Sequence, residues 1–216
     1  MRVNYIIMES IGFIEWCLEN LNYWTITLLM AIESSFIPFP SEVVVPPAAY
    51  KAAATGELNV WLVLFFSTLG AMIGAFVNYG LALWLGKPLV YKFANSRLGH
   101  MCLLDEQKVV KAEQFFVRYG VVATLIGRLV PGVRQLISVP AGLARMNIAK
   151  FAIYTAVGAG LWNAVLVAMG YFLESVVPES VLVETATKYS HEIGYCIMGV
   201  VALALAFVIY RGAKRR

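Results

Sequence analysis

The sequence predicts an all-α polytopic membrane protein, in which spanning helices are combined with two opposed re-entrant hairpins. Of its 216 residues, 60% are hydrophobic and only 14% are charged, and the mean hydropathy is +0.74. A soluble domain is about 45–50% apolar and about 25% charged. Long uncharged stretches alternate with apolar stretches that prolines interrupt. These observations exclude a disordered chain and an ordinary water-soluble domain.

Residues 1–22 are predicted to form an amphipathic helix that lies in the membrane interface. Isoleucine and leucine recur on one helical face, and Glu9, Glu15 and Glu19 lie on the opposite face. Such a helix buries its apolar face among the lipid chains and keeps its polar face in water.

A membrane domain is predicted over residues 23–175, and it begins with a re-entrant hairpin at about 24–54. A proline costs about 3 kcal/mol inside a helix, so one straight span is excluded here. Irregular backbone at membrane depth is tolerated only inside protein or beside a water-filled cavity. The prolines of this segment are Pro38, Pro40, Pro46 and Pro47.

Two stretches without a charged side chain are predicted to cross the membrane, at about 58–86 and 151–173. Small residues recur every four positions in both stretches, which lets a neighbouring backbone approach closely in lipid. Residues 87–118 between them are rich in lysine and arginine and are predicted to form a cytoplasmic loop. The two small-residue stripes are Gly70, Gly74, Asn78, Ala82 and Gly86, and Ala152, Ala156, Gly160, Ala164 and Ala168.

A second re-entrant hairpin is predicted at about 121–145, where an apolar stretch is again interrupted. Pro131 and Pro140 are nine residues apart, as are Pro38 and Pro47 in the first hairpin. Each later proline opens a small-residue run, and the spans that follow are predicted to run in opposite directions. The sequence therefore predicts an inverted repeat of the kind found in transporters. The residues expected to shape the two hairpins are Pro38, Pro40, Pro47, Pro131, Gly132, Pro140 and Gly142.

Residues 176–216 are predicted to form an outer loop, a last transmembrane helix and a basic tail. The loop at 174–192 is rich in glutamate, and the helix is expected at 194–210. Because cytoplasmic segments carry an excess of lysine and arginine, the C-terminus is predicted to be cytoplasmic.

Four ionisable residues fall inside the predicted hairpins: Glu33 and Glu42 in the first, Arg128 and Arg134 in the second. Each would cost about 2.5–3.5 kcal/mol at the centre of a simple span, so a function is the default interpretation. Arginine offers a fork of donors that suits phosphate oxygens, and a desolvated carboxylate tends to take up a proton. The structural alternative is two ion pairs that lock the hairpin tips together.

The sequence offers no set of residues for metal, cofactor or enzyme chemistry. Cys17, Cys102 and Cys196 lie far apart, and His100 and His191 stand in loops without partner residues. A lipid phosphatase, the alternative from another class, would be expected to use a histidine near the arginines. We therefore expect no metal, no cofactor and no enzymatic activity.

Three motifs resemble those of the DedA membrane proteins, which belong to the wider VTT (SNARE-associated) superfamily. They are the stretch from Glu33 to Glu42 (ESSFIPFPSE), the run from Gly127 to Arg134 (GRLVPGVR), and Pro140-Ala-Gly142. The resemblance covers roughly residues 25–175. It implies two facing re-entrant hairpins and movement of lipids across the membrane, including undecaprenyl phosphate and phospholipids, with a proton-motive force proposed for some members.

The family's acidic pair corresponds to Glu33 and Glu42 in this sequence, and its arginine pair to Arg128 and Arg134. The chain departs from the family at Ala75, where many members carry an aspartate after the glycine that corresponds to Gly74. The role of that aspartate is absent here or has passed to Asn78.

These observations predict a flippase-type transporter of a phosphate-bearing lipid in the bacterial inner membrane, with undecaprenyl phosphate as the favoured substrate. In this hypothesis the two arginines hold the phosphate, and the two glutamates exchange protons or supply counter-charge. The alternatives are a transporter or scramblase of a phospholipid such as phosphatidylethanolamine, and a proton-coupled exporter of small cations or drugs. The expected partners are membrane lipids and protons but no nucleic acid, and the prediction allows for a homo-oligomer.

Overall fold

The computed structural model describes residues 16–17, 20–35, 40–96, 106–130, 133–178, 180–190, 192–193, 195–196 and 199. This part of the chain is helical and contains no strand, which confirms the all-α class. The elements are α2 (Tyr23–Glu33), the short 3₁₀ helix η1 (Ser41–Val43), α3 (Val45–Thr55), α4 (Val60–Ala94), α6 (Glu106–Leu129), α7 (Ser138–Leu143) and α8 (Ile148–Leu173). Residues 180–190 are also helical.

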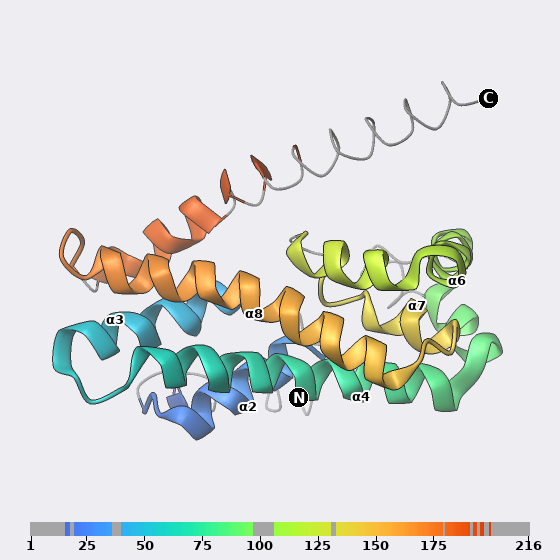
Figure 1. The fold of residues 1–216 in the computed structure, drawn as a ribbon, viewed down its shortest axis with the longest axis horizontal. Helices are drawn as coiled ribbons and strands as arrows, with labels where there is room; N and C mark the ends of the chain where they lie inside the picture. Colours follow the sequence, from blue (N-terminus) through green and yellow to red (C-terminus); the bar gives the residue numbers. More distant parts are fainter. Residues whose placement is uncertain are drawn as a thin grey trace, which may run out of the picture.

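The long helices α4 and α8 pack against each other along the middle of the fold (Figure 1). In the described part of the chain, the two helices long and apolar enough to cross a membrane are Val60–Gly86 and Ile148–Leu173. They overlap the predicted spans. Trp61 and Trp84 lie near the two ends of the first span and are 74% and 82% exposed. Tryptophans in this position are typical of a membrane–water interface.

We call α2, η1 and α3 the first broken segment of the fold. Its first helix begins at Asn22, whose side chain accepts hydrogen bonds from the backbone N–H groups of Trp24 and Thr25. Pro46 and Pro47 lie in the first turn of α3, where a missing N–H breaks no helical hydrogen bond. The interruption of the helix therefore lies between α2 and η1, and Pro46 and Pro47 lie at the start of a new helix.

We call α6 and α7 the second broken segment. A non-helical residue, Tyr119, with φ −132° and ψ 22°, kinks α6 close to the predicted start of the second hairpin. The helix then continues to Leu129, and the six-residue α7 follows after a turn at 133–137. Pro140 is the third residue of α7, as Pro47 is the third residue of α3.

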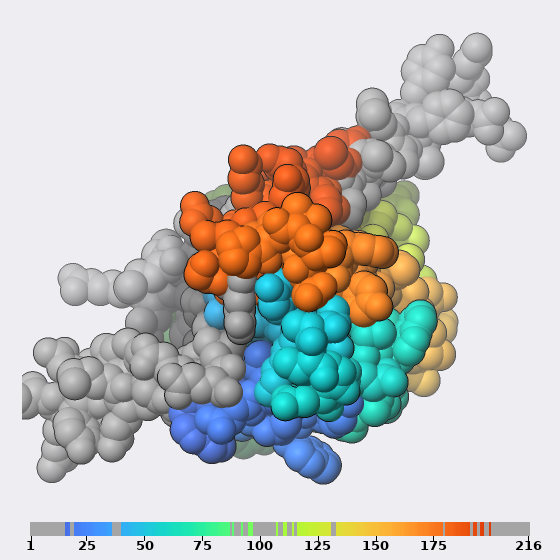
Figure 2. Space-filling model, turned by 90° about the vertical axis from the view of Figure 1, so that its left-hand side faces the viewer, coloured from blue at the N-terminus to red at the C-terminus, as the bar shows by residue number. Residues whose placement is uncertain are grey.

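Each broken segment packs on both long helices: α2 contacts α4 and α3 contacts α8, while α6 contacts α8 and α7 contacts α4. Viewed from one end, residues of α2, α3, α4 and α8 form one continuous body (Figure 2).

Close approach of the broken segments to α4 depends on glycine. A Cβ added at Gly70 or Gly74 of α4 would collide with α2, and one at Gly142 of α7 would collide with α4. The first predicted small-residue stripe is therefore a helix-packing face, as expected.

The second predicted small-residue stripe, on α8, is not the face that makes close helix contacts. The positions of α8 that approach neighbours closely are Gly158, against α6, and Gly170, against the backbone of Pro46. At Gly160 an added Cβ would be in ordinary contact with Thr68. The buried face of α8 carries large side chains such as Phe151 and Trp162, so small-residue spacing alone identified the wrong face.

Several predictions concern residues outside the described part of the chain. They are the interfacial helix at 1–22 except for its last few residues, Pro38, Pro131, Gly132, part of the 87–118 loop, most of the last transmembrane helix, and the basic tail.

Candidate functional site

The two broken segments meet at an ion-paired cluster between the long helices. One nitrogen of Arg134, Nη2, donates a hydrogen bond to Oε1 of Glu33 at 3.0 Å. The same nitrogen lies 3.8 Å from Oε2 of Glu42 and 2.6 Å from the hydroxyl of Ser41. A single arginine therefore serves both glutamates of the first broken segment.

Glu33 is the last residue of α2 and is only 2% exposed. The C-terminal end of a helix carries partial negative charge, which disfavours a carboxylate there. Donors from both segments offset this cost: Arg134, the amide of Gln135 at 3.3 Å, and the hydroxyl of Ser34 at 2.8 Å. Glu42 makes weaker contacts, since the hydroxyl of Ser41 lies 3.5 Å from its carboxylate.

Arg128 lies one residue before the end of α6 and is 3% exposed. It donates from Nη2 to the hydroxyl of Ser138 at 2.8 Å, and its Nε–H has no hydrogen-bond partner among the described residues. No described carboxylate lies within ion-pair distance of it. The helix end favours a cation, but the charge of Arg128 is otherwise without a counter-charge in contact.

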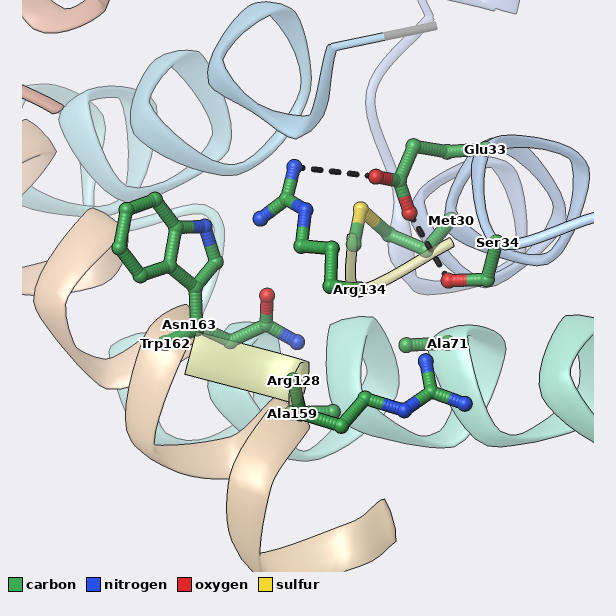
Figure 3. Close-up of a pocket in the computed structure, with 9 residues that line it drawn as sticks. All are labelled: Met30, Glu33, Ser34, Ala71, Arg128, Arg134, Ala159, Trp162 and Asn163. Atoms are coloured by element: carbon green, nitrogen blue, oxygen red, sulfur yellow. Dashed lines mark hydrogen bonds and ion pairs between the residues drawn. The ribbon is translucent and has the colours of Figure 1, made fainter. Parts of the chain in front are cut away.

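A small cavity joins the two arginines. It is lined by Met30, Glu33, Ser34, Ala71, Arg128, Arg134, Ala159, Trp162 and Asn163, all shown in Figure 3. Its volume is about 10 Å³, which is roughly the space that one water molecule needs. The indole of Trp162 forms one wall, with its ring centroid 5.2 Å from the guanidinium carbon of Arg134. This is cation–π distance.

Asn78 of α4 ties both broken segments to the first span. Its side-chain NH₂ donates to the backbone carbonyl of Ser34 at 3.0 Å and to that of Gln135 at 3.5 Å. Asn78 therefore makes hydrogen bonds from α4 to both broken segments. It stands one turn after Ala75 in α4.

The structure thus brings together Glu33, Glu42 and Arg134, and it places Arg128 at the same cavity without pairing it to a glutamate. Pro40 immediately precedes η1, and Pro47, Pro140 and Gly142 lie in the short helices that follow the two breaks. No group of three or more histidine, cysteine, aspartate or glutamate side chains within the described ranges could hold a metal ion.

The sequence did not identify the neutral polar groups of the site. Ser41, Ser138 and Gln135 each bond to one of the four charged residues. Trp162, which the sequence did not single out either, lines the cavity. The available signal was its distance from either end of an uncharged span, which is unusual for an interfacial tryptophan.

The fold and the site define a helical membrane protein whose broken segments carry buried, mutually compensating charges. The family profile of the VTT domain matches residues 37–172, more than half of the chain. The chain therefore belongs to the VTT-domain family, which includes the DedA proteins.

Relatives named for lipid transport are among the similar proteins. Undecaprenyl phosphate transporter A of Bacillus subtilis strain 168 is 29% identical over 89% of this chain and 90% of its own length. The protein of the same name from Staphylococcus aureus is 28% identical over 71% of this chain and 74% of its own length. An alkaline phosphatase-like protein of Lactococcus lactis is 32% identical over 71% of both chains. No solved structure matches this chain significantly.

Proposed function

We propose that this protein moves a phosphate-bearing lipid, undecaprenyl phosphate, between the leaflets of the bacterial inner membrane. Membership of the VTT-domain family and the two relatives named undecaprenyl phosphate transporter A support this proposal. In this proposal the chain crosses the membrane several times and its C-terminus is cytoplasmic, in accord with the excess of basic residues there.

The observation that carries the proposal is the unequal pairing of the two arginines. Arg134 is neutralised by Glu33 and Glu42, whereas Arg128 faces the same cavity and has the hydroxyl of Ser138 as its one hydrogen-bond partner among the described residues. A buried cation without a counter-ion is costly. The anionic head group of a lipid would supply that counter-ion, and arginine is well suited to phosphate oxygens.

The charges of the site also suggest how protons enter the cycle. Two arginines and two glutamates make the site electrically neutral when all four are ionised. An entering phosphate adds negative charge and competes with the glutamates for Arg134. Transfer of one proton to Glu33 or Glu42 would compensate one unit of that negative charge. Proton uptake would then accompany binding of the head group.

We further propose that the two broken segments are re-entrant hairpins of an inverted repeat. Their packing supports this, since α2 on α4 corresponds to α6 on α8, and α3 on α8 corresponds to α7 on α4. Glu33 and Arg128 occupy similar places near the ends of α2 and α6. Because the cavity has room for about one water molecule, the head group can enter only when the two segments separate.

The other candidate functions fit the site less well. A cation exporter would need accessible carboxylates, but both glutamates are already engaged by Arg134. A passive phospholipid scramblase would use the same arginines without proton uptake. A phosphatase, suggested by the name of the Lactococcus lactis relative, would hydrolyse the lipid instead of moving it.

The test is the amount of undecaprenyl phosphate in the outer leaflet of cells with and without this protein. Loss of the protein is expected to raise the outer-leaflet amount while total undecaprenyl phosphate stays constant. An unchanged distribution would contradict the proposed transport. A rise in total lipid phosphate on loss of the protein would indicate a phosphatase.

A further inference from the structure

We propose that the indole N–H of Trp162 binds the lipid phosphate together with Arg128. The inference rests on the proposed function and assigns a ligand role to a residue outside the charged motifs. Trp162 is 2% exposed and is among the largest fully buried side chains of the described structure. It also lines the cavity that holds the two arginines (Figure 3).

The first support is a buried hydrogen-bond donor without an acceptor. Nε1 of Trp162 has no hydrogen-bond partner among the described residues. Buried indole N–H groups usually find one, and leaving a buried donor unsatisfied costs about 1–3 kcal/mol. An acceptor in the cavity beside Trp162 would remove this cost.

The second support is that Arg128 has the same deficiency at the same cavity. Its Nε–H is buried and unpartnered, while its Nη2 bonds to Ser138. Two buried donors that lack acceptors favour a ligand with several acceptor oxygens. A phosphate group has such oxygens. When it is ionised, it also supplies a negative counter-charge for Arg128.

The third support is the contact between Trp162 and Arg134. The guanidinium carbon of Arg134 lies 5.2 Å from the ring centroid of Trp162, so the ring holds Arg134 beside the cavity. In Figure 3 the nitrogen edge of the indole is directed toward the side on which Arg134 lies. The guanidinium of Arg128 is directed away from Trp162 in the same view, so a phosphate would contact Arg128 and the indole N–H together only after the broken segments separate.

The test uses Trp162→Phe, which keeps an aromatic ring beside Arg134 and removes the N–H donor. The matched control is Trp84→Phe, the same substitution at a position that is 82% exposed. Purified proteins in lipid nanodiscs are titrated with undecaprenyl phosphate, undecaprenol and inorganic phosphate. We expect Trp162→Phe to weaken binding of both phosphate ligands about ten- to hundred-fold and to leave undecaprenol binding unchanged. Trp84→Phe should bind all three ligands like the wild type.

The outcomes separate this inference from the proposed function. If the wild type binds undecaprenyl phosphate and Trp162→Phe binds it equally well, the N–H is not a ligand and only water satisfies it. If the wild type does not bind this lipid, the proposed function itself is wrong. Inorganic phosphate that binds as tightly as the lipid would identify an ion site and overturn the lipid assignment. If Trp162→Phe does not fold, replacement of Trp162 by benzothienylalanine, which keeps the shape of the indole without the N–H, decides by the same criterion.

Discussion

The two broken segments have corresponding positions in the fold but opposite electrostatic situations. The first ends α2 with Glu33, a carboxylate at the unfavourable end of a helix, which accepts hydrogen bonds from Ser34 and, across the interface, from Arg134 and Gln135. The second places Arg128 near the end of α6, where the helix favours a cation, and gives it one serine. Arg134 of the second segment satisfies the acids of the first.

This difference separates two roles that the sequence presents as one arginine pair. Arg134 holds the two segments together in the closed arrangement. Arg128 contributes little to that closure, since its described hydrogen bond lies within the second segment. We therefore expect Arg134 to dominate stability and Arg128 to dominate binding of an anionic head group.

Replacing each arginine by methionine gives the largest effect and tests this division directly. Arg134→Met leaves Glu33 and Glu42 buried without a cation, and we expect it to lower the free energy of unfolding by about 3–5 kcal/mol. Arg128→Met removes an unpaired buried charge, so the free energy of unfolding should be unchanged or higher. Denaturant titration of both variants in the same detergent measures the difference. Equal losses of stability would contradict the division.

Substitution of two glycines tests the close helix crossings of the two segments. Gly74→Ala would push a methyl group into the backbone carbonyl of Ala31, whereas Gly158→Ala would push it into the side chain of Arg128. We expect both to cost about 1–3 kcal/mol, as overpacking does. Gly158→Ala should also abolish transport, because it displaces Arg128.

Gly80→Ala is the control for these two variants, since an added Cβ there has open space. It should leave transport intact and stability unchanged or slightly higher. Normal transport by a folded Gly158→Ala variant would show that the position of Arg128 is not critical.

The charged residues and the two long spans could be predicted because their signals are local. An intramembrane charge or an uncharged stretch of more than twenty residues is visible without knowing what surrounds it. The division of labour between Arg128 and Arg134 could not be predicted in this way. It depends on which side chain reaches across from one segment to the other, over a sequence separation of 101 residues between Arg134 and Glu33.

The two glutamates also contribute unequally to stability, and the difference between them is smaller than that between the arginines. Glu33→Gln removes the carboxylate that Arg134, Gln135 and Ser34 all contact, and we expect a loss of about 2 kcal/mol. Glu42→Gln loses a 3.8 Å ion pair and should cost less than 1 kcal/mol. Both variants should still bind lipid phosphate in proteoliposomes, while transport no longer responds to an imposed pH gradient. A wild-type rate that is indifferent to the gradient, and equal to the rates of both variants, would favour a passive scramblase.

A small effect is also expected at Asn78, which joins the two segments to α4. Asn78→Ala removes the donors to the carbonyls of Ser34 and Gln135, and we expect a loss of about 1 kcal/mol. Asn163→Ala is the control, since its side chain makes one hydrogen bond among the described residues, 3.4 Å to Thr68, against the two made by Asn78. Thermal unfolding of both variants, with Asn163→Ala the less affected, would support the bridging role of Asn78.

Trp162 and the serines illustrate why the neutral part of the site escaped prediction. Serine and tryptophan are common in membrane helices for packing and anchoring, so neither residue type marks a site by itself. Their significance comes from contact with buried charge, which only the folded arrangement creates. The packing face of α8 was mispredicted for a related reason: its buried face carries both large and small residues, so the spacing of small residues does not identify it.

The most direct test is transport of undecaprenyl phosphate in proteoliposomes that contain equal amounts of folded wild type or Arg128→Met. If Arg128 is the cation that binds the lipid phosphate, transport depends on Arg128 while stability depends on Arg134. We expect leaflet-specific labelling to detect movement of the lipid by the wild type and none by Arg128→Met, although this variant is at least as stable. Transport by Arg128→Met at the wild-type rate would show that Arg128 does not bind the lipid phosphate.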